Sequence, residues 1–144
     1  MVEEIKHGNR LLALVLRASH QADGIQFFTP REFSQQLAYM KRPAGYVIEP
    51  HLHTPVVREV LYTKEVLMIR SGRVRVDFYD DDEHYLQSRV LEQGDVILLA
   101  FGGHGFEMLE ASEIVEVKQG PYAGDADKRR FAPVAADQVR WSTR

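Results

Sequence analysis

Between residues 25 and 118 the chain is a succession of short β-prone segments, and this pattern constrains the fold more than any other feature. In the segment RVRVDFY, residues 73–79, apolar residues alternate with mostly charged ones, which predicts a strand with one buried and one wet face. The apolar positions are Val74, Val76 and Phe78. Many short strands with close turns predict an all-β sandwich or barrel. Turn signals stand at Pro30 and within residues 43–45, 71–72, 80–82, 93–94 and 102–103.

The first 24 residues have a different character. LLALVL, residues 11–16, is a continuous apolar run, with Asn9 ahead of it as a helix cap and Gly24 after it as a turn. This pattern predicts a short N-terminal helix within residues 3–18.

A chain of 144 residues forms one domain with a core of its own. We expect residues 1–24 to be the helical segment, 25–118 the barrel and 119–144 a tail. The tail is irregular and polar, and we expect three side chains to pack it on the barrel. They are Phe131, Val134 and Trp141.

Composition excludes several function classes. The chain has no cysteine, which excludes disulfides, thiolate zinc sites and cysteine nucleophiles. The net charge is 18 − 21 = −3 and the basic residues are scattered apart from Lys128, Arg129 and Arg130, so no nucleic-acid partner is expected. The apolar run at residues 11–16 is too short to cross a bilayer and poorly flanked for a signal peptide, so we expect no membrane association and a cytoplasmic location.

Two short motifs raise the question of a metal. In EPHLHTP, residues 49–55, a strand conformation places His51 and His53 on one face, close enough to chelate one ion, although both also suit a polar loop. In DDDEH, residues 80–84, the acidic cluster lacks the glycine and distal glutamate of a calcium loop, which predicts a solvated hairpin turn.

The spacing of glycines, histidines and a glutamate resembles the two conserved motifs of the cupin superfamily, over roughly residues 35–118. The matching patterns are Gly45-x5-His51-x-His53, Glu65-x6-Gly72 and Gly94-x7-Gly102-x-His104. The resemblance implies an antiparallel jelly-roll β-barrel.

The resemblance also implies a bound metal. Its ligands would be His51, His53, Glu65 and His104, and its cofactor one divalent transition metal: Fe, Mn, Ni, Co, Cu or Zn. Glu59 competes with Glu65 for the carboxylate, since it lies nearer to the histidines; Glu65 is preferred for its spacing to Gly72.

A loop inserted between the first histidines and the glutamate, residues 54–64, is predicted to lie near the barrel mouth. Residues expected to contact a small-molecule ligand are Arg42, Arg58, Tyr62 and Phe106. The segment GPYAGDADKRRF, residues 120–131, is open to two interpretations: it closes over the barrel, or it is a surface turn with internally paired charges.

In size and overall run the chain is similar to small single-domain cupins found alongside cell-surface polysaccharide biosynthesis proteins. That similarity implies a sugar-like ligand and a homodimer. Three functions stay open. They are a metal-dependent enzyme such as an isomerase or oxygenase, a metal-free nucleotide-sugar isomerase or epimerase, and a non-catalytic ligand-binding module.

Overall fold

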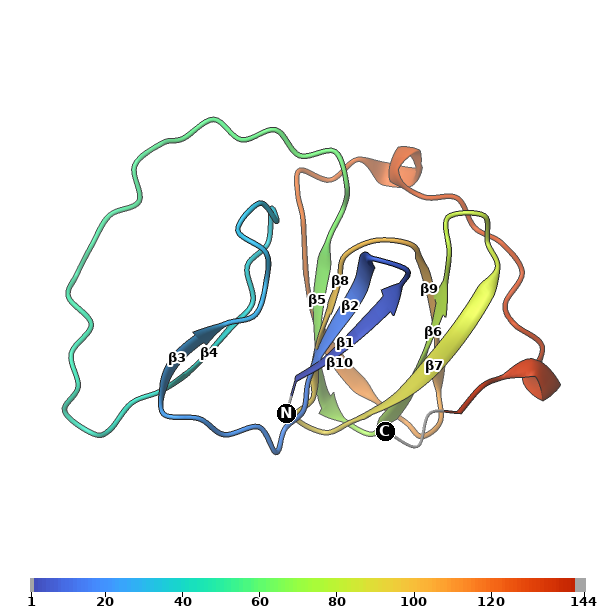
Figure 1. Ribbon diagram of the computed structural model, residues 1–144, viewed down its shortest axis with the longest axis horizontal. Helices are drawn as coiled ribbons and strands as arrows, with labels where there is room; N and C mark the ends of the chain where they lie inside the picture. The colour runs from blue at the N-terminus through green and yellow to red at the C-terminus, as the bar shows by residue number, and fades with distance from the viewer. Residues whose placement is uncertain (1, 142–144) are drawn as a thin grey trace.

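The computed structural model describes residues 2–141 and consists of antiparallel β-sheets (Figure 1). A five-stranded sheet has the order β1-β2-β8-β5-β10, a three-stranded sheet the order β7-β6-β9, and β3 pairs with β4. The all-β prediction is therefore confirmed. The strands are β1 (Val2–His7), β2 (Arg10–Leu16), β3 (Gly24–Phe27), β4 (Ala38–Lys41), β5 (Glu65–Ser71), β6 (Arg73–Tyr79), β7 (Tyr85–Glu92), β8 (Val96–Leu99), β9 (Gly103–Met108) and β10 (Glu113–Lys118).

The prediction of an N-terminal helix is wrong, because β1 and β2 form an antiparallel hairpin there. Asn9 is not a helix cap but belongs to the hairpin turn, in which Gly8 adopts a φ of 60°. The apolar run at residues 11–16 is buried on both faces: Leu12 belongs to one core cluster and Leu14 to another. A strand buried on both faces shows the same unbroken apolar run as a buried helix, which explains the error.

The main core lies between the five-stranded and three-stranded sheets. The alternation predicted for residues 73–79 is confirmed on this side, since Val74, Val76 and Phe78 are at most 1% exposed. The opposite face of β6, predicted to be wet, is also buried except at Arg73. Its residues Arg75 and Asp77 bond to each other, and the C-terminal tail covers this face.

A second, smaller core lies on the other face of the five-stranded sheet, where the β3–β4 segment packs. Leu14, Leu98 and Ala100 are its buried centre. The ammonium of Lys64 lies 4.9 Å from the ring centroid of Phe33, and burial lowers the pKa of this lysine.

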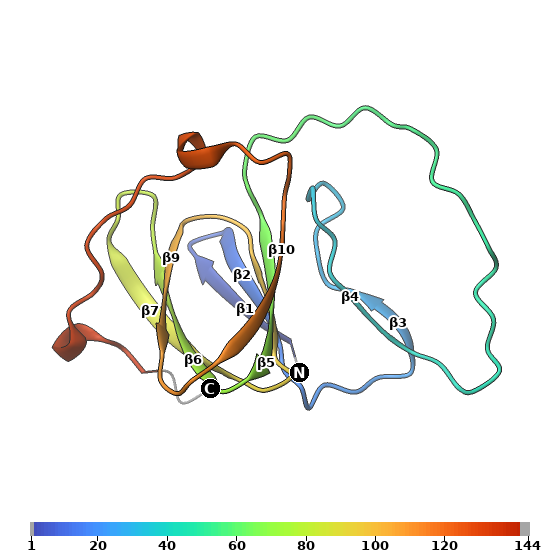
Figure 2. The ribbon, with the colours of Figure 1, turned by 180° about the vertical axis from the view of Figure 1, so that it is seen from behind.

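Residues 42–64 contain no strand, and most of this loop, before it returns to β5 at residues 62–64, extends well away from both sheets (Figures 1 and 2). The tail after β10 runs across the opposite side of the molecule and includes the short 3₁₀ helices η1 (Gly124–Asp127) and η2 (Ala136–Gln138). Among residues 2–141, no helix has the length and apolar character that crossing a membrane requires.

Candidate functional site

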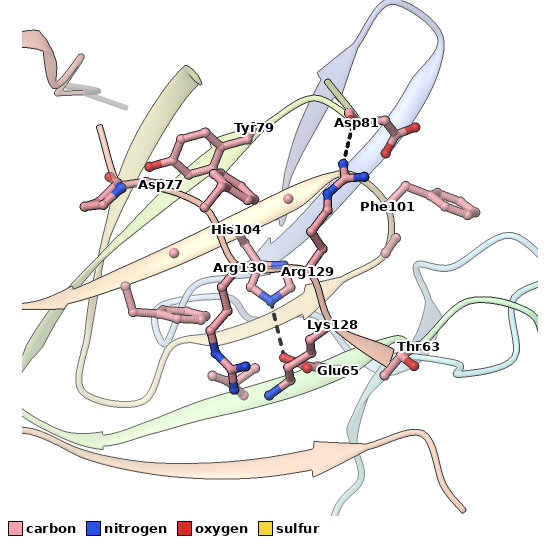
Figure 3. Close-up of a pocket in the computed structure, with 18 of the residues that line it drawn as sticks. Thr63, Glu65, Asp77, Tyr79, Asp81, Phe101, His104, Lys128, Arg129 and Arg130 are labelled. Atoms are coloured by element: carbon pink, nitrogen blue, oxygen red, sulfur yellow. Dashed lines mark hydrogen bonds and ion pairs between the residues drawn. The ribbon is translucent and has the colours of Figure 1, made fainter. Parts of the chain in front are cut away.

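A cavity of about 1070 Å³ lies between the two main sheets and under the C-terminal tail (Figure 3). Its walls come from β5, β6, β9 and β10, and residues 127–134 of the tail border it. Strands that are distant in sequence thus line the same cavity. The chemistry of the site depends on which polar side chains face this cavity.

Glu65 and His104 meet in this cavity. His104 Nε2 lies 3.5 Å from Glu65 Oε2, and the two side chains are 28% and 11% exposed. Glu65 opens β5, and the apolar residues Leu67 and Ile69 follow it on the core side of the strand. A carboxylate at the end of an apolar strand is thereby held at the cavity wall.

The charge around Glu65 favours its ionised form. The pKa of Glu65 lies below its ordinary value because His104 is within hydrogen-bonding reach, although burial opposes this shift. Lys118 and Lys128 lower the pKa further by their charge, and Lys118 Nζ lies 3.6 Å from Glu65 Oε1. The site therefore combines the carboxylate of Glu65 with an imidazole and two lysine side chains.

A glycine turn places His104. Gly102 adopts a φ of 74°, and a Cβ atom at this position would lie 2.5 Å from the carbonyl oxygen of Tyr79. Only glycine tolerates both the left-handed backbone and this close approach. The turn leads directly into β9, which carries His104 to the cavity.

The tail segment 128–134, here called the strap, passes over the cavity. Its Val134 N–H donates to the hydroxyl of Tyr79 at 2.9 Å, and the rings of Phe131 and Tyr79 lie 4.9 Å apart. Burial raises the pKa of Tyr79, so the phenol stays neutral at physiological pH. The strap is thus fixed by β6 rather than free in solvent.

The strap is basic. Arg129 pairs with Glu83 at 2.9 Å, and Arg130 lies 3.4 Å from Asp125. Lys128 extends toward Glu65 in Figure 3, and within residues 2–141 no carboxylate lies within salt-bridge distance of its ammonium. Both interpretations of this segment hold in part: it borders the cavity, and one of its three cations, Arg130, is paired within the segment, whereas Arg129 pairs with the β6–β7 turn.

A buried polar network braces the wall behind this site. Arg75 donates to both carboxylate oxygens of Asp77, at 2.8 and 3.0 Å, and Ser88 donates to the same carboxylate at 2.5 Å. The Tyr85 hydroxyl lies 2.7 Å from Ser88 Oγ and accepts the backbone N–H of Arg140. Strand β6, strand β7 and the tail are held together by bonded groups that would be costly to leave unpaired.

The structure divides the four predicted metal ligands into two pairs. Glu65 and His104 face each other, whereas His51 and His53 are exposed on the loop, with their rings 5.2 Å apart. His51 Nδ1 contacts the carbonyl oxygen of Glu49 at 2.8 Å. The described arrangement therefore does not fit one ion bound by all four side chains.

Another trio does bring its ligand atoms within 4.8 Å of one another: Asp80, Asp82 and His84. They belong to the hairpin turn between β6 and β7, where the carboxylate of Asp80 accepts the backbone N–H groups of Asp82 and His84, each at 2.9 Å. These bonds lower the pKa of Asp80. The turn conformation agrees with the sequence prediction and uses the carboxylate that a cation would need.

Of the four residues predicted to contact a small-molecule ligand, two line the cavity and two lie away from it. Tyr62 and Phe106 line the cavity. Arg42 lies elsewhere, 4.5 Å from the ring centroid of Tyr46, and Arg58 is exposed on the loop, as is the alternative carboxylate Glu59. Sequence reasoning did not single out Lys118 or Tyr79; the alternation of β10 and β6 marks them as strand residues but not as neighbours of His104.

Comparison with protein-family models, with curated proteins and with solved structures found no match to this chain.

Proposed function

We propose that the protein binds a small, anionic, sugar-like molecule in the cavity and that His104, assisted by Glu65, transfers a proton on it. The observation that carries this proposal is the contact between an imidazole and a buried carboxylate, 3.5 Å apart, on the wall of a cavity large enough for such a ligand. The reaction class is an isomerisation or epimerisation, which requires a base and a returned proton.

His104 and Glu65 suit proton transfer because the two side chains have different roles. The ionised Glu65 accepts the Nε2–H of His104, which leaves Nδ1 as the basic nitrogen. Nδ1 takes a proton from a carbon next to a carbonyl group of the ligand, and the carboxylate stabilises the imidazolium that forms. Return of the proton to that carbon or its neighbour completes the reaction, with no net change in protons or electrons.

Charge and shape support an anionic ligand with an apolar side. Lys128 lacks a carboxylate within salt-bridge distance among the described residues, so its charge is available to a phosphate or carboxylate. Tyr62 and Phe106 add aromatic surface to the cavity lining, and aromatic rings pack against the apolar faces of sugars. An enzyme of polysaccharide biosynthesis would meet such a ligand.

Imidazole resonances test this proposal. We would titrate ¹⁵N-histidine-labelled protein with inorganic phosphate and with glucose 6-phosphate and follow each ring by NMR. We expect His104 to shift at lower ligand concentration than the exposed His7, and Lys128→Met to weaken the response about tenfold. Lys6→Met, which changes an exposed lysine away from the cavity, is the matched control. Equal response of all histidines, or none, would contradict ligand binding at this site.

Metal binding by a closed cupin-type jelly roll is the second candidate. It is supported by the antiparallel two-sheet body and by the donor chemistry of His51, His53, Glu65 and His104. Because the described arrangement separates the two pairs, we derive no reaction step from a metal.

Plasma mass spectrometry of tag-free protein tests the second candidate. Near-stoichiometric metal, lost in both His51→Ala and Glu65→Ala, is the expected result for a four-ligand centre. Parent protein that stays metal-free after incubation with Fe, Mn, Ni and Zn would exclude it and leave the proton-transfer function in place.

A further inference from the structure

The loop contains an unusually apolar exposed segment, residues 46–60, which we call the arm. Val57 is 99% exposed and Leu52 93%, values close to those of an unfolded chain. The other exposed apolar residues of the arm are Tyr46, Val47, Ile48, Val56 and Val60. Contiguous apolar surface of this kind marks an interaction site on a soluble protein.

The backbone N–H and C=O groups of the arm also have few hydrogen-bond partners among the described residues. Within residues 2–141, the one bond between two backbone groups that involves the arm joins Tyr46 N–H to the Pro43 carbonyl, and the Glu49 carbonyl contacts the His51 side chain. The segment contains four valines and one isoleucine, residues that favour strands, although it forms no strand in this conformation. Pro50 and Pro55 lack an N–H group and, being five residues apart, would face opposite edges of a regular strand, so the stretches between and beside them are the parts that can pair with another strand.

The same chain carries a sheet edge without a partner. Strand β9 pairs only with β6, so its outer edge is unpaired within the described residues. Met108 on this strand is 48% exposed. An open edge next to exposed apolar side chains is a template for an added strand.

The arm and the β9 edge of one molecule lie on opposite sides of it. In Figure 1 and in the reverse view of Figure 2, strands β5 and β10 stand between the arm and β9. The arm in this conformation therefore cannot pair with its own β9.

We propose that the arm of one copy docks as an additional strand on the β9 edge of a second copy, and that the second copy returns the same contact. A chain that contains both donor and acceptor always has a suitable partner in another copy of itself, and a reciprocal contact closes at two. The arm and β9 together supply about 20 residues a side, which is the size of a standard interface.

Docking of the arm on a second copy changes the wall of the cavity. Because β9 lines the cavity, the arm of the second copy becomes part of its wall. The inference does not depend on the proposed ligand or reaction, and its tests measure association alone.

Light scattering during gel filtration gives the first test. We expect the parent at micromolar concentration to have twice the chain mass of 16.5 kDa, or 33 kDa. Val57→Glu buries a charge only if the arm docks, so we expect it to weaken the dimer at least about 100-fold and to leave a folded monomer. Tyr122→Glu, at a residue 94% exposed outside the arm and β9, should remain dimeric.

Disulfide trapping gives the second test, since the chain has no cysteine of its own. A Val57→Cys chain mixed with a Met108→Cys chain should form a mixed disulfide under mild oxidation, whereas Tyr122→Cys with Met108→Cys should not. A monomeric parent, a dimer unaffected by Val57→Glu, or trapping only within a Val57→Cys/Met108→Cys double variant would each overturn the proposal.

Discussion

The two-sheet body and the arm are similar in residue composition but lie in opposite environments. Both are rich in β-branched residues and both carry histidines, yet Val76 is fully buried in the body and Val57 is almost fully exposed on the arm. His104 meets the carboxylate of Glu65, whereas His51 contacts the Glu49 carbonyl and the ring of its neighbour His53. The comparison teaches that a β-prone sequence supplies the capacity to pair, and that burial and chemistry depend on whether a partner strand is present.

The largest expected effect contrasts one side chain from each region. Phe78 is 1% exposed in the core, so Phe78→Ala should lower the free energy of unfolding by about 3–5 kcal/mol. Val57→Ala should change it by less than about 0.5 kcal/mol at concentrations where the chain is monomeric. Urea denaturation of both variants measures the difference. Comparable losses would show that the arm is packed as tightly as the core.

A pair of glycines separates backbone conformation from crowding. Gly102 and Gly45 both have positive φ values, 74° and 83°, but a Cβ meets the Tyr79 carbonyl only at Gly102. Gly45→Ala, next to the arm, should cost about 1 kcal/mol, and Gly102→Ala about 1–3 kcal/mol more. Thermal unfolding compares the two variants, and equal costs would mean that the turn before His104 relaxes without strain.

The lowered pKa of Glu65 predicts a dependence of stability on pH. A carboxyl group whose pKa is lower in the folded state contributes stability that is fully present above its unfolded value of 4.5 and is lost as the pH falls through the folded value. Glu65→Gln should therefore destabilise the protein by about 1 kcal/mol at pH 7 and by less at acidic pH.

Glu49→Gln on the arm is the control for this pH dependence, since Glu49 is exposed. Urea unfolding at a series of pH values gives both curves. A Glu65→Gln curve parallel to that of the parent across the acidic range would contradict the linkage.

The smallest expected effect belongs to the arm histidines. His51 and His53 are exposed; their rings contact each other, and His51 also contacts the Glu49 carbonyl. His53→Ala should change the free energy of unfolding by less than about 0.5 kcal/mol at concentrations where the chain is monomeric. Chemical denaturation in the presence of a chelator measures this, and a larger loss would indicate that the arm packs on another surface in solution.

The sequence predicted several features because they depend on local pattern. Alternation identified the core face of β6, turn residues located most strand boundaries, and aspartates marked the hairpin turn after β6. It failed at residues 11–16, since an unbroken apolar run has no period that separates a buried strand from a buried helix.

By itself, the sequence determined the all-β class, the buried face of β6 and the residue types of a polar site. Only the tertiary structure decided that Glu65 and His104 meet without His51 and His53, that Lys128 borders the same cavity, and that the arm stays apart from both. The physical reason is the separation in sequence between the residues that interact. Strand formation and turns are set by neighbours in the chain, whereas the meeting of β5 with β9 and the tail depends on how the sheets pack, which no local pattern encodes.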